Sequence, residues 1–392
     1  MHVVALIAGF MCLTAVFVDA FQSIILPRRP TRRFRISRFF FVLTWTAWAA
    51  RAQQTKDPME REQVFSIYGP LSLLGLLLLW AMLLVFGFSF MFYGLGSPFT
   101  DVMGVQTASG MTRYRTDLYV SGTTLFTLGL GDVVPHSMGA RSLIVLESGV
   151  GLGFVALVIG YLPVLYQAFS RREVNIALLD ARAGSPPTAA ELLRRHGFEG
   201  GEEALTALLA EWERWAAELL ESHISYPILC YYRSQHDNQS WLAGLTAILD
   251  TCALLISVLE GEYSRQAQLT FVMARHAVID LGHVFQVQEM KVWKLQEGKD
   301  RLPPADFDRL CAVLGDVKLR LCGDPASAER LRTIRSLYEQ HAGALADYLR
   351  MPLPAWVPEA KEKDQWKMLN KVRSEAEEVS SRVAAYLNKN HH

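Results

Sequence analysis

The sequence lacks several features that would each indicate a familiar kind of soluble protein. Its 39 basic and 39 acidic residues leave no net charge, which argues against a nucleic-acid binder, because such proteins carry a basic excess. Its five cysteines show no C-x-x-C spacing and predict no cysteine metal site, so we interpret them as reduced, buried thiols. No G-x-G-x-x-G follows a predicted strand, and nothing β-rich indicates a cyclic-nucleotide pocket. We therefore expect no enzyme, no cofactor and no nucleic-acid partner.

Long apolar runs dominate residues 1–170, whereas residues 171–392 have the composition of a charged helical protein. A membrane-spanning helix needs about 20 consecutive apolar residues. Three runs are that long: Val3–Leu26, Tyr68–Tyr93 and Ser142–Phe169. A fourth, Phe39–Ala50, is too short, and its aromatic residues suit a helix from Ile36 to Arg51 lying in the membrane interface. A fourth span at this place remains the alternative.

Basic residues predict the orientation in the membrane. Six arginines lie between residues 28 and 38, after the first run, and Arg171 and Arg172 follow the last one. Since clusters of Lys and Arg stay on the cytoplasmic side, both clusters are predicted to lie inside the cell. This arrangement predicts a multi-pass protein of the plasma or inner membrane, with three spans, an outside N-terminus and a cytoplasmic C-terminal half.

The segment between the second and third spans has an unusual pattern for an exposed loop, because Leu118 to Leu130 is mostly apolar. Inside a membrane, backbone must be helical, buried in protein or exposed to a watery cavity. We therefore predict a re-entrant segment, in which Asp117 caps a short helix and residues 127–131 return outward as extended chain.

The extended part, Thr127-Leu-Gly-Leu-Gly131, has residue types suited to binding a dehydrated cation. A pore must replace the ion's water with other oxygens, and backbone carbonyls are the uncharged choice. Turning successive carbonyls toward one axis requires some left-handed residues, which Gly129 and Gly131 supply without a Cβ penalty. The hydroxyl of Thr127 adds one more oxygen, and the carboxyl end of the preceding helix favours a cation.

Thr127-Leu-Gly-Leu-Gly-Asp132, followed by Pro135, resembles the T-V-G-Y-G-D filter and downstream proline of pore-loop potassium channels. The resemblance covers residues 65–170 and implies an all-α membrane fold, with a helix, a pore loop and a second helix. It implies that potassium passes along the filter residues Thr127, Leu128, Gly129, Leu130 and Gly131. Because one filter occurs per chain and a closed ring of carbonyls needs four, it also implies a homotetramer.

One residue departs from that family's pattern. Leu130 replaces the usual aromatic residue of the filter, and the pore-helix position expected to anchor it is Val120, also apolar. The alignment places Tyr119 where the family has a partner for the filter aspartate, which predicts a bond to Asp132. Thr124 corresponds to the threonine-rich end of the pore helix. We assign Tyr119, Thr124 and Asp132 to support of the filter.

The last span contains candidates for gating or for the cavity: Glu147, Gly149, Gly151, Gly153 and Pro163. Glu147 either faces the cavity or the back of the filter, where it attracts cations, or it is buried and protonated, or bonded to a pore-helix threonine. The glycines and the proline either form a hinge or allow close packing of helices.

Residues 171–392 are predicted to form helices, with Thr188 capping the helix 189–196 and a soluble, buried helix at Trp241–Leu259. His276, Asp280 and His283 share a helical face, which favours a polar network, with Asp250 as a further member, over a metal site. We divide the chain into an anchor and interfacial segment (1–64), a pore domain (65–170) and a helical cytosolic domain (171–392) whose ligand the sequence does not identify. The alternatives to a potassium channel are a weakly selective cation channel and a membrane-anchored helical scaffold or sensor with a vestigial pore.

Overall fold

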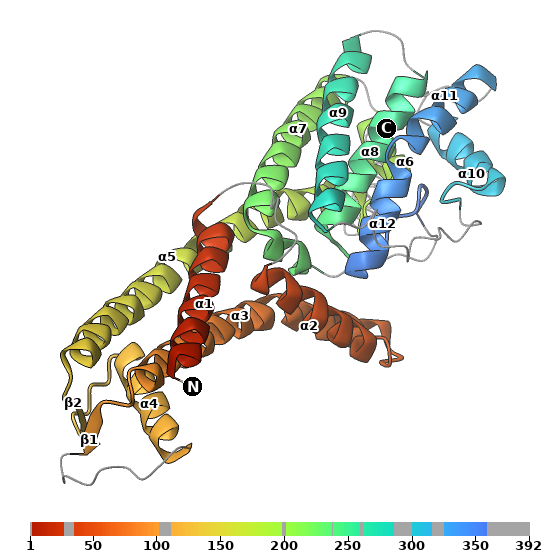
Figure 1. Ribbon diagram of the computed structural model, residues 1–392. Helices are drawn as coiled ribbons and strands as arrows, with labels where there is room; N and C mark the ends of the chain where they lie inside the picture. Colours follow the sequence, from red (N-terminus) through yellow and green to blue (C-terminus); the bar gives the residue numbers. More distant parts are fainter. Residues whose placement is uncertain are drawn as a thin grey trace, which may run out of the picture. The chain divides into compact units, whose positions relative to one another are not determined.

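The computed structural model describes residues 2–26, 35–101, 111–197, 201–236, 238–258, 262–285, 300–315 and 325–358. These residues form an almost entirely helical chain, with one pair of short strands (Figure 1). Among the described residues, three helices are long and apolar enough to cross a membrane: His2–Ile25, Pro58–Gly94 and Met138–Ala183. The all-α membrane architecture expected from the sequence is therefore confirmed. Four of the arginines used above to predict the orientation, at positions 28, 29, 32 and 33, lie outside the described residues.

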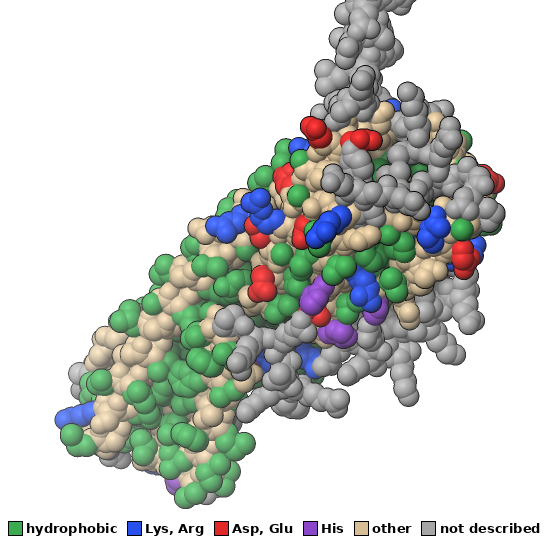
Figure 2. All heavy atoms as spheres, turned by 90° about the horizontal axis from the view of Figure 1, so that it is seen from above, with side chains coloured by type: hydrophobic (Ala, Val, Ile, Leu, Met, Phe, Trp, Pro, Cys, Tyr) green, Lys and Arg blue, Asp and Glu red, His purple; other side chains and the backbone are tan. Residues whose placement is uncertain are grey.

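The chain divides into two compact units. The first comprises Met1–Phe169 together with Ser222–Tyr232, and the second comprises Ser170–Glu221 and Arg233–His392. The short segment Ser222–Tyr232 therefore belongs to the first unit, although it lies within the C-terminal half of the sequence. Figure 2 shows that hydrophobic side chains make up most of the visible surface of the first unit and that charged ones are sparse there.

In the first unit, α1 (His2–Ala20) continues into the π-helix η1 (Phe21–Ile25) and packs along α3 (Pro58–Gly94). The two backbones approach closely where Gly9 meets Gly87: a Cβ on Gly9 would lie 2.6 Å from the Gly87 carbonyl oxygen. Small residues allow this approach in membranes, where packing replaces the hydrophobic effect as the force between helices.

A buried aspartate joins the first three helices. The carboxylate of Asp19 accepts hydrogen bonds from the backbone nitrogen of Ser37 at 3.0 Å, from its hydroxyl at 2.9 Å and from Trp80 Nε1 at 2.9 Å. Ser37 lies in the first turn of α2 (Ile36–Ala52), so a side chain of α1 satisfies one of the donors left open at the start of another helix. Arg35, whose Nε lies 3.8 Å from Asp19, supplies the compensating charge.

Helix α2, at 17 residues, is shorter than the spanning helices. Its buried Trp45 packs against Tyr68 of α3 and Tyr231 of the 3-10 helix η2 (Pro227–Tyr231), with ring centroids 4.8 and 5.1 Å apart. Tyr231 also stacks on Phe41 of α2 at 6.0 Å. The segment Ser222–Tyr232 is thus held in the first unit by aromatic contacts with two of its helices.

The end of α3 leads through β1 (Phe99–Asp101) towards α4 (Met111–Leu125), then through β2 (Val133–Pro135) into α5 (Met138–Ala183). The two strands pair antiparallel, with Phe99 opposite Pro135. Phe99 itself is buried against Phe92 of α3. The sheet thereby joins the segment that precedes α4 to the segment that follows it. Residues 126–132 lie between the end of α4 and the start of β2.

The second unit contains α6 (Ala189–His196) and most of α7 (Gly201–Ser225), followed by five further helices. These are α8 (Trp241–Val258), α9 (Glu262–Val284), α10 (Pro304–Gly315), α11 (Pro325–Ser336) and α12 (Glu339–Leu349). The hydroxyl of Thr188 accepts from the backbone nitrogen of Glu191, so the predicted cap of α6 is confirmed. The helix predicted over 360–388 lies outside the described residues.

Glu191 accepts hydrogen bonds from two arginines of its own helix, and one of them, Arg195, also bonds to the end of α5. Burial alone would raise the pKa of its carboxyl, but hydrogen bonds from Arg194 and Arg195 and their charges outweigh burial and lower that pKa to about 2. Arg195 also donates to the carbonyl oxygens of Asp180 and Ala181 at 3.1 and 2.6 Å. The Ala181 carbonyl is one that the last turn of a helix leaves open, whereas that of Asp180 also accepts from the backbone nitrogen of Gly184 at 2.9 Å.

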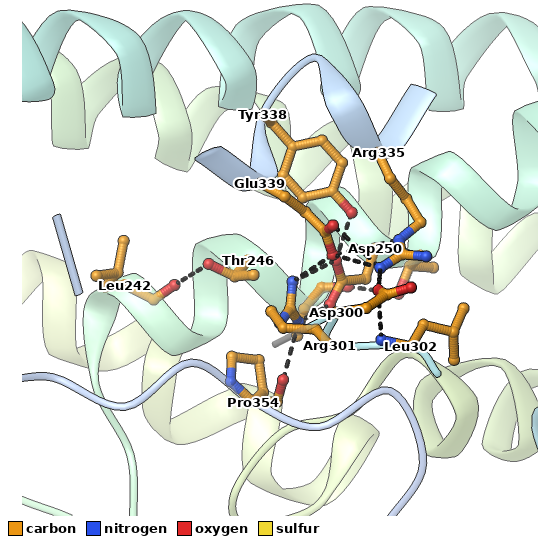
Figure 3. A network of polar contacts seen from close by, with 12 residues as sticks. Leu242, Thr246, Asp250, Asp300, Arg301, Leu302, Arg335, Tyr338, Glu339 and Pro354 are labelled. Atoms are coloured by element: carbon orange, nitrogen blue, oxygen red, sulfur yellow. Dashed lines mark hydrogen bonds and ion pairs between the residues drawn. The ribbon is translucent and has the colours of Figure 1, made fainter. Parts of the chain in front are cut away.

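The core of the second unit contains a charged network (Figure 3). Asp250, fully buried in the middle of α8, accepts from Arg301 and from the hydroxyl of Tyr338. Arg301 also donates to the carboxylate of Glu339 at 3.2 Å and to the carbonyl oxygen of Pro354 at 2.8 Å. A buried charge needs such partners, and α8 lies in the core of this unit. That this helix is soluble rather than a further span stays a prediction.

The cysteines correct one expectation. Cys12, Cys230 and Cys252 are free thiols, and the last two are buried. Cys311, however, is disulfide-bonded. The expectation of reduced thiols throughout was therefore wrong for this residue, because the lack of metal-ligand spacing says nothing about pairing between two cysteines.

Candidate functional site

The segment that follows α4 has the backbone conformation expected of a cation filter. Thr127, Gly129 and Gly131 have φ angles of +58°, +54° and +75°, and the two leucines between them do not have positive φ. Positive and negative φ angles therefore alternate over five positions, as expected of a segment that turns successive carbonyls toward one side. The prediction from the glycines is seen in the backbone, and it extends to Thr127, where a β-branched residue in this conformation is a rare and strained choice.

The base of this segment is held by the last turn of α4. The carbonyl oxygen of Thr123 accepts from the backbone nitrogen of Leu128 at 2.8 Å and of Gly129 at 3.4 Å, and that of Thr124 accepts from Thr127 at 3.0 Å. The hydroxyl of Thr123 donates back to its own helix. The carboxyl end of α4, with the negative end of its dipole, is thus next to Thr127.

Two groups hold the outer end of the segment. The hydroxyl of Tyr119 donates to Asp132 at 2.7 Å, the contact that the sequence predicts. Beyond Asp132, the chain enters β2 and pairs with β1. Val120 is buried on α4, whereas Leu130 is 65% exposed in the single chain.

The start of α4 differs from the prediction. The helix begins at Met111 rather than at Asp117, which lies in its second turn and is fully buried. Asp117 accepts a hydrogen bond from the hydroxyl of Ser97 at 2.6 Å. It therefore does not cap the helix but joins it to the chain that follows α3. The prediction failed because Asp117 is the first acid before the apolar run, whereas the helix starts in polar sequence.

Glu147 lies behind the filter segment and is fully buried. One carboxyl oxygen is 2.5 Å from the hydroxyl of Ser121 on α4, and that hydroxyl is also 2.9 Å from the carbonyl oxygen of Val85 on α3. Of the interpretations that the sequence left open, the structure shows burial and a bond to the pore helix, with a serine in the place of the expected threonine.

The candidates for a hinge in α5 separate into two groups. A Cβ on Gly151 would lie only 2.0 Å from the carbonyl oxygen of Leu125, so this glycine permits close packing of α5 on the end of α4. Gly149 and Gly153 have no heavy atom of the described chain within 4 Å of such a Cβ. Pro163 lies inside the continuous helix α5.

A possible metal site in the second unit is not supported. Asp280 Oδ2 lies 2.8 Å from His276 Nε2, whereas Asp280 Oδ1 lies 3.8 Å from His283 Nδ1. The described residues contain no group of three or more His, Cys, Asp or Glu that could hold a metal ion. Asp250, expected as a further member of this polar group, belongs instead to the network with Arg301 and Tyr338.

Several residues that shape the site were not identified from the sequence: Ser97, Thr123 as a backbone acceptor, and Ser121. A serine on a helix gives no sign of its partner when that partner lies 26 positions away, as Glu147 does. The signal that was available is the rarity of an acid within a membrane span, which implies a hydrogen-bond partner on a neighbouring helix.

Comparisons with known proteins agree with this geometry. A family model described as an ion channel matches residues 78–167. A curated protein of Bacillus subtilis (strain 168), named "Uncharacterized membrane protein YdjJ", is 25% identical over 221 residues, which cover 56% of this chain and 62% of that protein. The similarity thus extends over less than two thirds of the relative's length. No solved structure matches the chain.

Proposed function

We propose that the chain is one subunit of a homotetrameric, potassium-selective channel, and the match of residues 78–167 to an ion-channel family model supports this. The observation that supports this most is the alternation of positive and negative φ angles from Thr127 to Gly131, between two helices long enough to span a membrane. In this proposal, carbonyls of residues 127–131 and the Thr127 hydroxyl replace the hydration shell of each ion, one chain supplying a quarter of every ring.

The surface of the first unit supports assembly into a ring. Leu128 and Leu130 are 62% and 65% exposed in the single chain. In the apolar stretch of the inner helix α5, only 11% of the residues are buried. The corresponding stretch of α3 is 56% buried. Apolar side chains beside a cation path would face water in a monomer, so further copies of the chain are the natural cover for them.

Potassium flux into liposomes tests the proposal. Replacing Gly129 or Gly131 by alanine introduces no clash within the described chain, since no heavy atom lies within 4 Å of a Cβ added at either glycine. It does force a residue with a Cβ into left-handed backbone, at about 1–2 kcal/mol per subunit. We expect tetramers without potassium flux, whereas Gly343→Ala, at an open position in α12 of the second unit, leaves flux unchanged. Wild-type flux in both filter variants would refute the assignment.

A weakly selective cation channel is the second candidate, and Leu130 is the observation that favours it. A leucine has no hydroxyl to anchor the filter, and Val120 on α4 offers no donor or acceptor in return. The filter is then held by the Tyr119–Asp132 bond and by packing. Reversal potentials with potassium and sodium on opposite sides separate the two candidates, and a protein that passes neither ion would be a scaffold with a vestigial pore.

We further propose that α1 begins outside the cell and that the second unit is cytoplasmic. The basic residues that follow η1, and Arg171 and Arg172 within α5, support this through the positive-inside rule. Arg171 is exposed, whereas Arg172 is buried and paired with Glu173 at 2.8 Å. Of the two, Arg171 is therefore the one that supports this orientation.

A further inference from the structure

The contact between α5 and α4 contains more hydrogen-bond acceptors than hydrogens. The hydroxyl of Ser121 has one hydrogen, yet it lies 2.9 Å from the Val85 carbonyl oxygen and 2.5 Å from a carboxyl oxygen of Glu147. A carbonyl oxygen can only accept. If Ser121 donates to Val85, the short contact to Glu147 needs a second hydrogen, and the carboxyl group is the one group there that can carry it.

The surroundings of Glu147 favour the same assignment. Its second carboxyl oxygen is buried and has no hydrogen-bond partner among the described residues. No cation of the described chain compensates a charge there, and Ser121 is its single polar contact. Ser121, which contacts it from α4, does not titrate, and neither does Val85, whose carbonyl oxygen is near the Ser121 hydroxyl. Asp117, the acid of α4, lies one turn before Ser121 and accepts a hydrogen bond from Ser97. An ionised carboxylate in such a site is strongly unfavourable.

From this geometry we infer that Glu147 is a neutral carboxylic acid that positions the pore helix by donating a hydrogen bond to Ser121, which in turn donates to Val85. This relay joins α5, α4 and α3 at one point behind the filter. The inference rests on the proposed channel function and deepens it by naming the group that fixes α4 from behind.

A second contact between α5 and α4, one turn further along both helices, makes their packing at Glu147 rigid. Gly151 follows Glu147 by four residues, and Leu125 follows Ser121 by four residues. Since residues four apart lie on the same face of a helix, the hydrogen bond and the close approach of Gly151 to Leu125 lie one turn apart along both helices. Leu125 is two residues from Thr127, so any displacement of α5 at this face is transmitted to the base of the filter.

The amide of glutamine has the shape of a neutral carboxyl group and can donate to Ser121 in the same way, whereas alanine removes the bond. We expect Glu147→Gln to keep potassium flux and the potassium-to-sodium permeability ratio within about threefold of the wild type. We expect Glu147→Ala to reduce flux by tenfold or more in a tetramer of normal size. Ser148→Ala, the next position on α5, serves as the matched control and should leave flux unchanged.

Infrared spectroscopy measures the protonation state directly and does not depend on flux. The difference spectrum of wild type minus Glu147→Gln should contain the carbonyl stretch of a protonated carboxylic acid at neutral pH, and Ser121→Ala should shift that band by removing its acceptor. A carboxylate band instead, or Glu147→Gln as inactive as Glu147→Ala, overturns the inference. If the wild type conducts no ion, the channel proposal fails while the infrared result still decides the state of Glu147. If Glu147→Ala does not fold, Ser121→Ala takes its place in the flux assay, and wild-type flux there also overturns the inference.

Discussion

The close approach of α5 to the end of α4 makes Gly151→Ala the most informative single substitution in the first unit. The added methyl group would lie 2.0 Å from the carbonyl oxygen of Leu125, 2.9 Å from its carbonyl carbon and 3.2 Å from its Cα. All three are backbone atoms, so no side-chain rotation relieves the clash. To restore a contact of 3.0 Å, the two helices must separate by about 1 Å, and overpacking of this kind destabilises by about 1–3 kcal/mol in each copy.

The expected result follows from what lies next to Leu125. The carbonyl groups of Thr123 and Thr124 accept hydrogen bonds from Thr127, Leu128 and Gly129 at the base of the proposed filter, so a shift of this turn misplaces Thr127. We expect Gly151→Ala to lower potassium flux in liposomes at least tenfold and to lower the midpoint of thermal unfolding. Gly153→Ala is the control, because it adds the same methyl group to the same helix at a position with no described atom within 4 Å. If Gly151→Ala has the flux and unfolding midpoint of the wild type, the close packing of α5 on α4 is refuted.

Three further predictions concern selectivity, orientation and the second unit. Leu130→Tyr paired with Val120→Trp should sharpen potassium-over-sodium selectivity in reversal-potential measurements more than Leu130→Tyr alone. The reason is that the hydroxyl of the single variant would be buried without a partner, which costs about 1–3 kcal/mol. Equal selectivity in the wild type, the single variant and the double variant would show that Leu130 is a neutral replacement. A reporter active only outside the cytoplasm should be active before Met1 and silent after Arg172, and activity after Arg172 would reverse the orientation. In the second unit, burial opposes ionisation of Glu191, but its two neighbouring arginines lower its pKa from 4.5 to about 2. Its stabilising effect is therefore complete above pH 4.5 and should be lost as the pH falls toward 2, by on the order of 3 kcal/mol. Glu191→Gln should lack this part of the pH dependence in denaturant titrations followed by tryptophan fluorescence, and an unchanged profile would contradict it.

The elements that the sequence predicted well are those set by local pattern. Spanning helices follow from the length of apolar runs, and left-handed backbone follows from the spacing of Gly129 and Gly131, because each depends on residues near one another in the chain. The tyrosine that bonds to Asp132 was placed through the resemblance to a known filter. These features required no knowledge of which helix lies beside which.

The features that were missed or wrong depend on contacts between distant residues. Asp117 looked like a helix cap because an acid before an apolar run favours that role, yet its partner is Ser97, 20 residues earlier. Asp19 had no assigned role, although it joins α1, α2 and α3 through Ser37 and Trp80. A single acid in an apolar run indicates that a partner exists, but the identity of the partner is decided by helix packing.

The position of Ser222–Tyr232 in the first unit has a consequence for experiments that divide this protein. A chain ended after Ala183 loses more than the second unit, because it also loses Tyr231 and leaves the faces of Phe41, Trp45 and Tyr68 without their aromatic neighbour. Failure of such a shortened chain to assemble would then have two explanations, of which only one concerns the second unit. Supplying residues 222–232 as a separate peptide, or rejoining them to α5 through a flexible linker, restores the missing part and leaves the second unit as the single difference.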